Sequence, residues 1–195
     1  MANPENLERY SSVAIVLHWL IAAALIFNIC LGLYCANIPD SDPNHFVFVQ
    51  IHKSVGLSVL VLSVLRLIWR LSHPAPPLPA WMPWSLRALA RTTHVLLYVL
   101  IIGIPLSGWA YVSASPLGLP TRYFGLFTWP NLPFFDQLTR AQKNPLHHEV
   151  HSVHTALAYA AIALITIHVA GALFHQFMRR DRLMARMWWL QARQT

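Results

Sequence analysis

The sequence predicts an all-α integral membrane protein, a bundle of four transmembrane helices with both termini in the cytoplasm. Three observations support this fold class. Of the 195 residues, 56% are hydrophobic and 11% are charged, whereas a soluble domain carries about 25% charged residues. The apolar residues gather into long runs. Arginines flank these runs, so the net charge of +7 indicates membrane topology and no nucleic-acid partner.

The four helices are expected at residues 11–36, 46–70, 89–113 and 151–178, in one domain that covers residues 1–195. A span needs about 20 apolar residues to cross a bilayer. The first run has acidic residues before it and no small-residue cleavage site, which predicts a retained helix rather than a signal peptide. PAPPLPAWMPW ends the second helix, because proline removes donors and clashes with the preceding turn. Pro105 is expected to kink the third helix, and residues 114–146 form a long aromatic and proline-rich connection.

The charge distribution predicts the orientation. Positive residues concentrate in the second connection and in the tail: Arg66, Arg70, Arg87 and Arg91, then Arg179, Arg180, Arg182, Arg186 and Arg193. The first connection offers Asp40 and Asp42 before Lys53, and the third spreads its few cations over a longer stretch. Because cytoplasmic loops carry the excess of lysine and arginine, both termini are expected in the cytoplasm.

Four of the histidines inside the predicted spans lie at matching depths, and an ionisable residue in a span is a functional hypothesis by default. His18 and His168 lie near the cytoplasmic ends of their helices, and His52 and His154 near the outer ends. His154 and His168 are fourteen residues apart, close to four helical turns, so they share one face about 21 Å apart along the axis. This leaves room for two stacked macrocycles, each bound by the fourth helix and one other. Two neutral imidazoles on opposite faces of iron suit electron transfer, because no position stays open for oxygen.

Other interpretations of the histidines stay open. Polar side chains also hold membrane helices together by hydrogen bonds. A peripheral zinc site at HHEVH, residues 147–151, is a second alternative, although this stretch lacks one residue of the H-E-x-x-H signature. A transporter that relays protons through its histidines is a third.

Four stretches together resemble the bacterial cytochrome b561 family: VLHWLIAAAL, QIHKSVGLSVLVLSVLRLIWRL, RTTHVLLYVLIIGIPLSGW and HTALAYAAIALITIHVAGALFHQF. The resemblance extends from Arg9 to Arg180, and the chain is also similar to the cytochrome b subunits of hydrogenases and formate dehydrogenases. It implies a multi-pass protein of the bacterial inner membrane with two b-type haems. The implied axial ligands are His18 and His168 for the inner haem, and His52 and His154 for the outer one. His94 matches a histidine at the start of the family's third helix. The resemblance leaves its role open between contact with a haem propionate, a place in a substrate or quinone pocket, and a hydrogen bond between helices.

The resemblance leaves the roles of other residues open. Arg66, Arg70, Arg87 and Arg91 either pair with propionates of the inner haem or only set the topology. His175 lies seven residues after His168 and either approaches the inner haem edge or ends the helix. His45 and His151 are fallback outer ligands, His73 is expected in solvent, and the roles of His147 and His148 are open.

The function implied is electron transfer between a periplasmic donor and membrane quinone, with superoxide as a candidate donor and ubiquinone as the acceptor. A basic outer face would attract such an anion: Lys53, Arg122, Lys143, His147 and His148. The alternative is an anchor and electron-relay subunit of a membrane-bound dehydrogenase or hydrogenase, which would dock its partner on WPNLPFFDQL. That stretch is equally suited to the membrane interface. The oligomeric state is not indicated.

Overall fold

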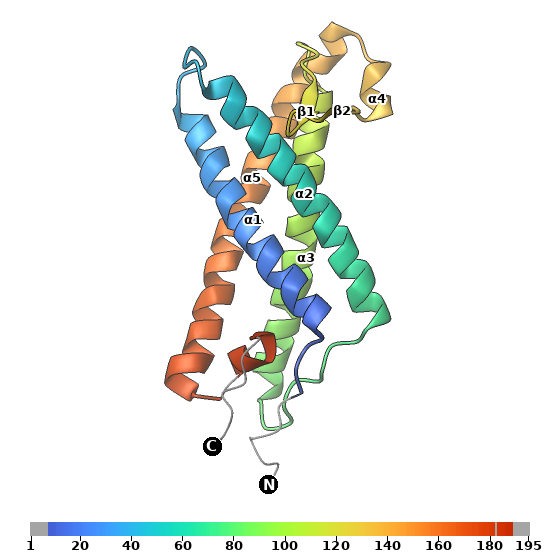
Figure 1. Ribbon diagram of the computed structural model, residues 1–195. Helices are drawn as coiled ribbons and strands as arrows, with labels where there is room; N and C mark the ends of the chain where they lie inside the picture. The colour runs from blue at the N-terminus through green and yellow to red at the C-terminus, as the bar shows by residue number, and fades with distance from the viewer. Residues whose placement is uncertain (1–7, 182, 189–195) are drawn as a thin grey trace.

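Four long helices dominate the computed structural model, which describes residues 8–181 and 183–188 (Figure 1). They are α1 (Ser12–Asn37), α2 (His45–Ser72), α3 (Trp84–Ser113) and α5 (Arg140–Leu173), and a π-helical turn, Phe174–Arg179, extends α5. All four are long and apolar enough to cross a membrane. The expected all-α membrane bundle is therefore confirmed. Two tail arginines used for the orientation, Arg182 and Arg193, lie outside the described residues.

The start of α5 differs from the expected one: the helix begins at Arg140, eleven residues before residue 151. Thr139 and Gln142 form a capping box, in which the Thr139 amide donates to Gln142 Oε1 (2.9 Å) and the Gln142 amide donates to Thr139 Oγ1 (3.4 Å). Pro145 lies inside the helix without ending it. Residues 140–150, expected in the connection, are therefore helical. Similarly, α3 begins at Trp84 rather than at residue 89, directly after an N-cap proline.

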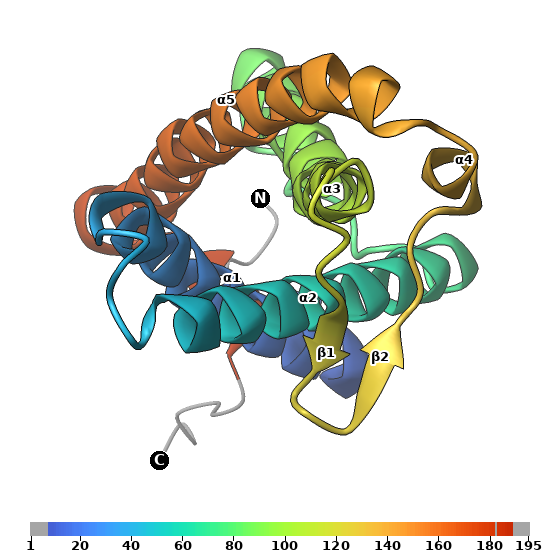
Figure 2. The same cartoon turned by 90° about the horizontal axis from the view of Figure 1, so that it is seen from above.

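The helices pack as a chain of neighbours, α1 on α2, α2 on α3 and α3 on α5, and close into a ring when seen from above (Figure 2). The buried core cluster consists of Ile21, Leu25, Val59 and Ile101. Ile165 of α5 packs against it. Along the four helices, this cluster lies between the two predicted layers of histidines. An aliphatic layer therefore separates them.

A β-hairpin, unexpected from the sequence, interrupts the connection between α3 and α5. Strand β1 (Thr121–Tyr123) pairs antiparallel with β2 (Phe127–Trp129), and the short helix α4 (Pro133–Asp136) follows. In the turn, Phe124 and Gly125 both have positive φ, 46° and 77°. The amide of Leu126 donates to the Tyr123 carbonyl at 2.9 Å. Glycine adopts this backbone freely, whereas a phenylalanine in it costs about 1–2 kcal/mol.

Both described ends of the chain lie at the opposite end of the bundle from the hairpin (Figure 1). Arg186, in the 3-10 helix Leu183–Met187, is buried. Its Nε donates to the Glu8 carbonyl at 2.9 Å, and its Nη2 donates to the carbonyls of Pro76 and Pro77 at 2.9 and 3.0 Å. We call the two ends of the bundle the terminal end and the hairpin end. That the terminal end faces the cytoplasm stays a prediction from the charge pattern.

Candidate functional site

Histidine rings from different helices lie close together in pairs, with their planes nearly perpendicular, at two levels of the bundle. At the terminal end, the ring centroids of His18 (α1) and His168 (α5) are 6.4 Å apart, with an angle of 73° between the planes. At the hairpin end, the centroids of His52 (α2) and His154 (α5) are 6.3 Å apart, at 86°. The structure thus brings together the same partners that the sequence places at matching depths. Their role as metal ligands stays a prediction.

Hydrogen bonds orient both rings of the hairpin-end pair. His52 Nδ1 lies 3.1 Å from the carbonyl oxygen of Asn28 on α1. His154 Nδ1 lies 3.1 Å from the carbonyl oxygen of Ile104 and 3.0 Å from Ser107 Oγ, both on α3. When Nδ1–H donates to these oxygens, the lone pair of each ring is on Nε2, the atom that is then free to bind a metal.

Two glycines provide the space behind these rings. A Cβ atom on Gly32 of α1 would lie 2.8 Å from His52 Cε1, and one on Gly108 of α3 would lie 3.0 Å from His154 Cε1. Any larger residue would push the imidazole out of position. Sequence reasoning missed both glycines, because each lies on a different helix from the histidine it accommodates.

The terminal-end pair has different surroundings. A third imidazole, His94 of α3, lies 5.5 Å from His168 between ring centroids. His18 Nδ1 is buried, and no hydrogen-bond partner for it occurs among the described residues. Buried polar atoms normally have a partner. An unpartnered one is typical of a site whose ligand is not part of the polypeptide.

A pocket adjoins the terminal-end pair and is lined by cationic and aromatic side chains, among them Tyr10, Arg66, Trp69, Arg70, His94 and Tyr98. The Arg66 guanidinium lies over the Tyr98 ring at 5.4 Å, and that of Arg70 over the Tyr10 ring at 5.8 Å. Arg87 and Arg91, which the sequence grouped with them, do not line this pocket. Guanidinium groups bind carboxylates with two parallel hydrogen bonds. The pocket therefore suits an anionic group.

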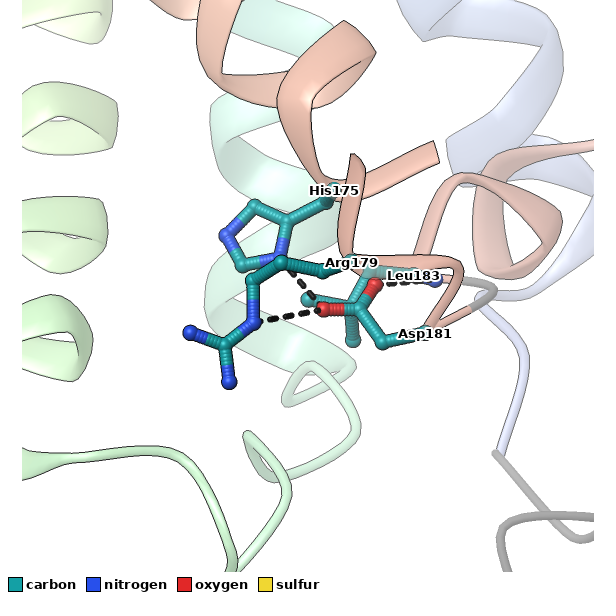
Figure 3. A network of polar contacts seen from close by, with 4 residues as sticks. All are labelled: His175, Arg179, Asp181 and Leu183. Atoms are coloured by element: carbon teal, nitrogen blue, oxygen red, sulfur yellow. Dashed lines mark hydrogen bonds and ion pairs between the residues drawn. The ribbon is translucent and has the colours of Figure 1, made fainter. Parts of the chain in front are cut away.

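His175 belongs to a separate network in the π-helical turn (Figure 3). Its Nδ1 lies 2.5 Å from Asp181 Oδ2, and Arg179 Nε lies 3.8 Å from the same oxygen. The Leu183 amide donates to Asp181 Oδ1 at 3.3 Å. These contacts join the end of α5 to the following segment, which supports the helix-ending role among the two that the sequence left open.

The remaining histidines lie apart from the two pairs. His45 Nδ1 is 3.2 Å from Asp40 Oδ1 at the start of α2, and His73 stacks on Trp69. The ring of His147 stacks on Tyr111, and that of His151 lies 5.0 Å from the same tyrosine. Within residues 8–181 and 183–188, no three His, Cys, Asp or Glu side chains form a group able to hold a metal ion. The zinc alternative has no support there.

The separations between the paired rings fit ligation of one iron from both sides. A metal–imidazole bond of about 2.0 Å and a nitrogen-to-centre distance of about 1.2 Å place two opposed ring centroids about 6.4 Å apart. The structure has 6.4 and 6.3 Å. Together with the unpartnered His18 nitrogen and the glycines behind His52 and His154, this donor set fits a haem at each level.

Comparisons with known proteins agree along nearly the whole chain. The family model of prokaryotic cytochrome b561 matches residues 9–189. The chain is 31% identical over 181 residues to cytochrome b561 homolog 2 of Escherichia coli (strain K12), covering 92% of this chain and 91% of that protein. It is 27% identical over 185 residues to cytochrome b561 homolog 1 of the same organism, with 93% and 97% covered. It is 26% identical over 182 residues to the probable superoxide oxidase CybB of Yersinia pestis, with 92% and 96% covered.

Proposed function

The chain belongs to the prokaryotic cytochrome b561 family, and we propose that it holds two b-type haems and carries electrons from a periplasmic donor to quinone in the membrane. Family membership and the four apolar helices make it a multi-pass electron-transfer cytochrome of the bacterial inner membrane, with b-type haem as its cofactor. The number of haems, the donor, the quinone and the ligands are the parts that we propose.

The two histidine pairs are the observation that carries the proposal. His18 and His168 would bind the iron at the terminal end, and His52 and His154 the iron at the hairpin end. A bound haem supplies a reversible one-electron couple. The protein's part is to hold each imidazole neutral and oriented, through the carbonyls of Asn28 and Ile104 at the hairpin end. Arg66, Arg70 and His94 would bind the propionates of the terminal-end haem.

Superoxide is the candidate donor and ubiquinone the candidate acceptor. Two superoxide anions each lose one electron and become oxygen, while one quinone gains both electrons and two protons and becomes quinol. A relative of similar length is named a probable superoxide oxidase. Lys53 of α2 and Arg122 of β1 lie on segments of the hairpin end, where positive charge would attract an anion.

The ligand assignment predicts a specific result for each histidine of α5. His154→Ala and His168→Ala should each remove one haem and leave one low-spin haem, because each iron loses one of its two axial ligands. The measurement is the haem-to-chain ratio with the reduced-minus-oxidised spectrum, and His151→Ala is the matched control that should keep both haems. Two low-spin haems in both α5 variants would contradict the pairing.

The donor is tested by stopped-flow spectroscopy of the purified protein with its haems bound. Superoxide should reduce the haems faster than it dismutates, and added ubiquinone should reoxidise them. Haem reduction no faster than spontaneous dismutation would rule out superoxide as the donor, although the haem content could still be as proposed.

A second function is favoured by exposed apolar side chains in the third connection, Leu117 and Phe134. They would suit an anchor and electron-relay subunit that docks a separate dehydrogenase. This alternative predicts copurification of a redox enzyme from native membranes and haem reduction only in its presence.

A further inference from the structure

The tip of the hairpin exposes large apolar side chains. Phe124 is 51% exposed, Leu126 78% and Phe127 51%. We propose that this tip, residues 123–127, is a lipid anchor that inserts beside α2 into the membrane interface at the hairpin end. The proposal depends on the membrane location of the family and not on the haems or the electron donor.

The hairpin docks on the side of α2 and not on its end. Its contacts come from one stripe of the helix. Gln50 Nε2 donates to the Pro120 carbonyl (3.0 Å), Ser54 Oγ donates to the Arg122 carbonyl (3.2 Å), and Ser58 Oγ lies 2.9 Å from the Tyr123 hydroxyl. Ser58 is thirteen residues into α2, about 20 Å along the helix. The hairpin therefore lies along a segment that crosses the membrane, and it projects outside the ring of long helices (Figure 2).

The same stripe of α2 continues as an exposed apolar surface. Val61 and Leu65 follow Ser54 and Ser58 at helical spacing, and both are exposed. In a membrane helix, an exposed aliphatic stripe faces lipid. The tip of the hairpin is thus continuous with a lipid-facing surface, which favours lipid over a soluble protein as its partner.

Three backbone amides of the hairpin, those of Arg122, Phe124 and Leu126, are paired as a lipid environment requires. The Arg122 amide donates to Gln50 Oε1 (3.2 Å), and the Phe124 amide donates to Ser54 Oγ (2.9 Å). The Leu126 amide donates within the turn. Unpaired backbone groups are strongly unfavourable in lipid, whereas water would satisfy them in a solvated loop. Side chains of α2 thus cover strand β1 where lipid would otherwise meet it.

The residue at the turn also favours an interfacial role. Phe124 occupies the left-handed region, where glycine or asparagine is unstrained. This backbone conformation places the Phe124 ring at the exposed tip. Aromatic rings concentrate at the membrane–water interface.

Depth-dependent fluorescence quenching tests the proposal. In full-length protein with Cys30 and Cys35 changed to serine, Leu126→Cys is labelled with an environment-sensitive fluorophore and reconstituted into phosphatidylcholine–phosphatidylglycerol vesicles. Nitroxide lipids labelled near the headgroup should quench it strongly, and aqueous iodide should quench it several-fold less than a label at Ser41→Cys in the exposed α1–α2 connection. Ile26→Cys, on the exposed middle of α1, provides the deep-membrane reference.

Iodide quenching of the Leu126 label as strong as that at Ser41 would overturn the proposal, because the tip would lie in water. Weak quenching by both agents would also overturn it and would indicate a protein contact, such as a second copy of the chain. A further variant, Phe124→Asn with Phe127→Ser, keeps the left-handed turn but removes both rings. It should raise iodide quenching of the Leu126 label and leave the helical circular dichroism of the protein unchanged. Unchanged quenching would show that the rings do not hold the tip in lipid.

Discussion

Gly108 has no side chain at the point where α3 meets the imidazole of His154. A Cβ there would lie 3.0 Å from His154 Cε1, whereas a Cβ on Gly103 of the same helix meets nothing within 4 Å. Gly108→Ala should therefore displace the ring and weaken or abolish haem binding at the hairpin end, with Gly103→Ala as the matched control. The measurement is the haem-to-chain ratio. Equal haem content in the two variants would contradict the role of Gly108.

The hydroxyl of Ser107 is predicted to tune the redox potential of the iron that His154 would bind. This hydroxyl is one of two oxygens within hydrogen-bond distance of His154 Nδ1. An Nδ1–H that donates to oxygen makes the imidazole a stronger donor to a bound metal, which stabilises the oxidised iron. Ser107→Ala should therefore raise the midpoint potential of the hairpin-end haem in a spectroelectrochemical titration. Ser63→Ala, which removes a buried hydroxyl without a hydrogen bond among the described residues, should leave both potentials unchanged.

The sequence predicted the histidine partners but not what holds them, and the reason is physical. Depth in the membrane follows from chain position, so His18 and His168 could be assigned to one layer from the sequence. Gly32 and the carbonyl of Asn28 meet His52 only through the way α1 packs on α2. Such contacts depend on how each helix is rotated about its axis. A helix that is apolar on nearly all faces has no sequence pattern that fixes this rotation.

At the scale of elements, α5 is the helix that both pairs share, and its start depends on one local motif. The sequence showed the fourteen-residue spacing between His154 and His168, but Pro145 made the start of the helix hard to predict. The Thr139–Gln142 capping box was visible in the sequence as T-R-A-Q and would have placed the start correctly. The hairpin was harder to predict, because its strands have three residues each and are held by Gln50 and Ser54, about 70 residues earlier.

Removing the cap should affect the first turns of α5 only. Thr139→Ala deletes the hydroxyl that accepts from the Gln142 amide, a loss of about 1 kcal/mol. Hydrogen exchange of the amides of residues 140–144 should become faster, while haem content stays unchanged. Ser152→Ala, which removes an exposed hydroxyl bonded inside the same helix, is the control. Unchanged exchange in Thr139→Ala would mean that packing, rather than the cap, holds this turn.

At the scale of the whole molecule, Arg186 connects three segments that are distant in the sequence. Its guanidinium donates to carbonyls of Glu8, Pro76 and Pro77, and it lies 5.6 Å from the Tyr10 ring. Arg186→Ala should lower the free energy of unfolding by about 2–3 kcal/mol, because charge-assisted hydrogen bonds are lost together. Thermal unfolding in detergent measures this.

The control for Arg186 is Arg179→Ala, whose guanidinium is more exposed and lies 3.8 Å from Asp181. The Arg179 side chain is 38% exposed and the contact is long, so we expect this ion pair to contribute about 1 kcal/mol or less. Equal melting temperatures for the two variants would show that the terminal end is held by helix packing and not by this arginine.

The aliphatic layer between the histidine pairs has an electrical consequence. Its four buried members, Ile21, Leu25, Val59 and Ile101, carry no group that can bind or release a proton. In the proposed function, an electron that passes this layer therefore moves as a bare charge across a low-dielectric slab. The free energy of moving one electron across the full membrane changes by about 2.3 kcal/mol for every 100 mV of membrane potential. The transmembrane voltage of the cell would thus set part of the driving force, and a de-energised membrane would shift the balance of oxidised and reduced sites.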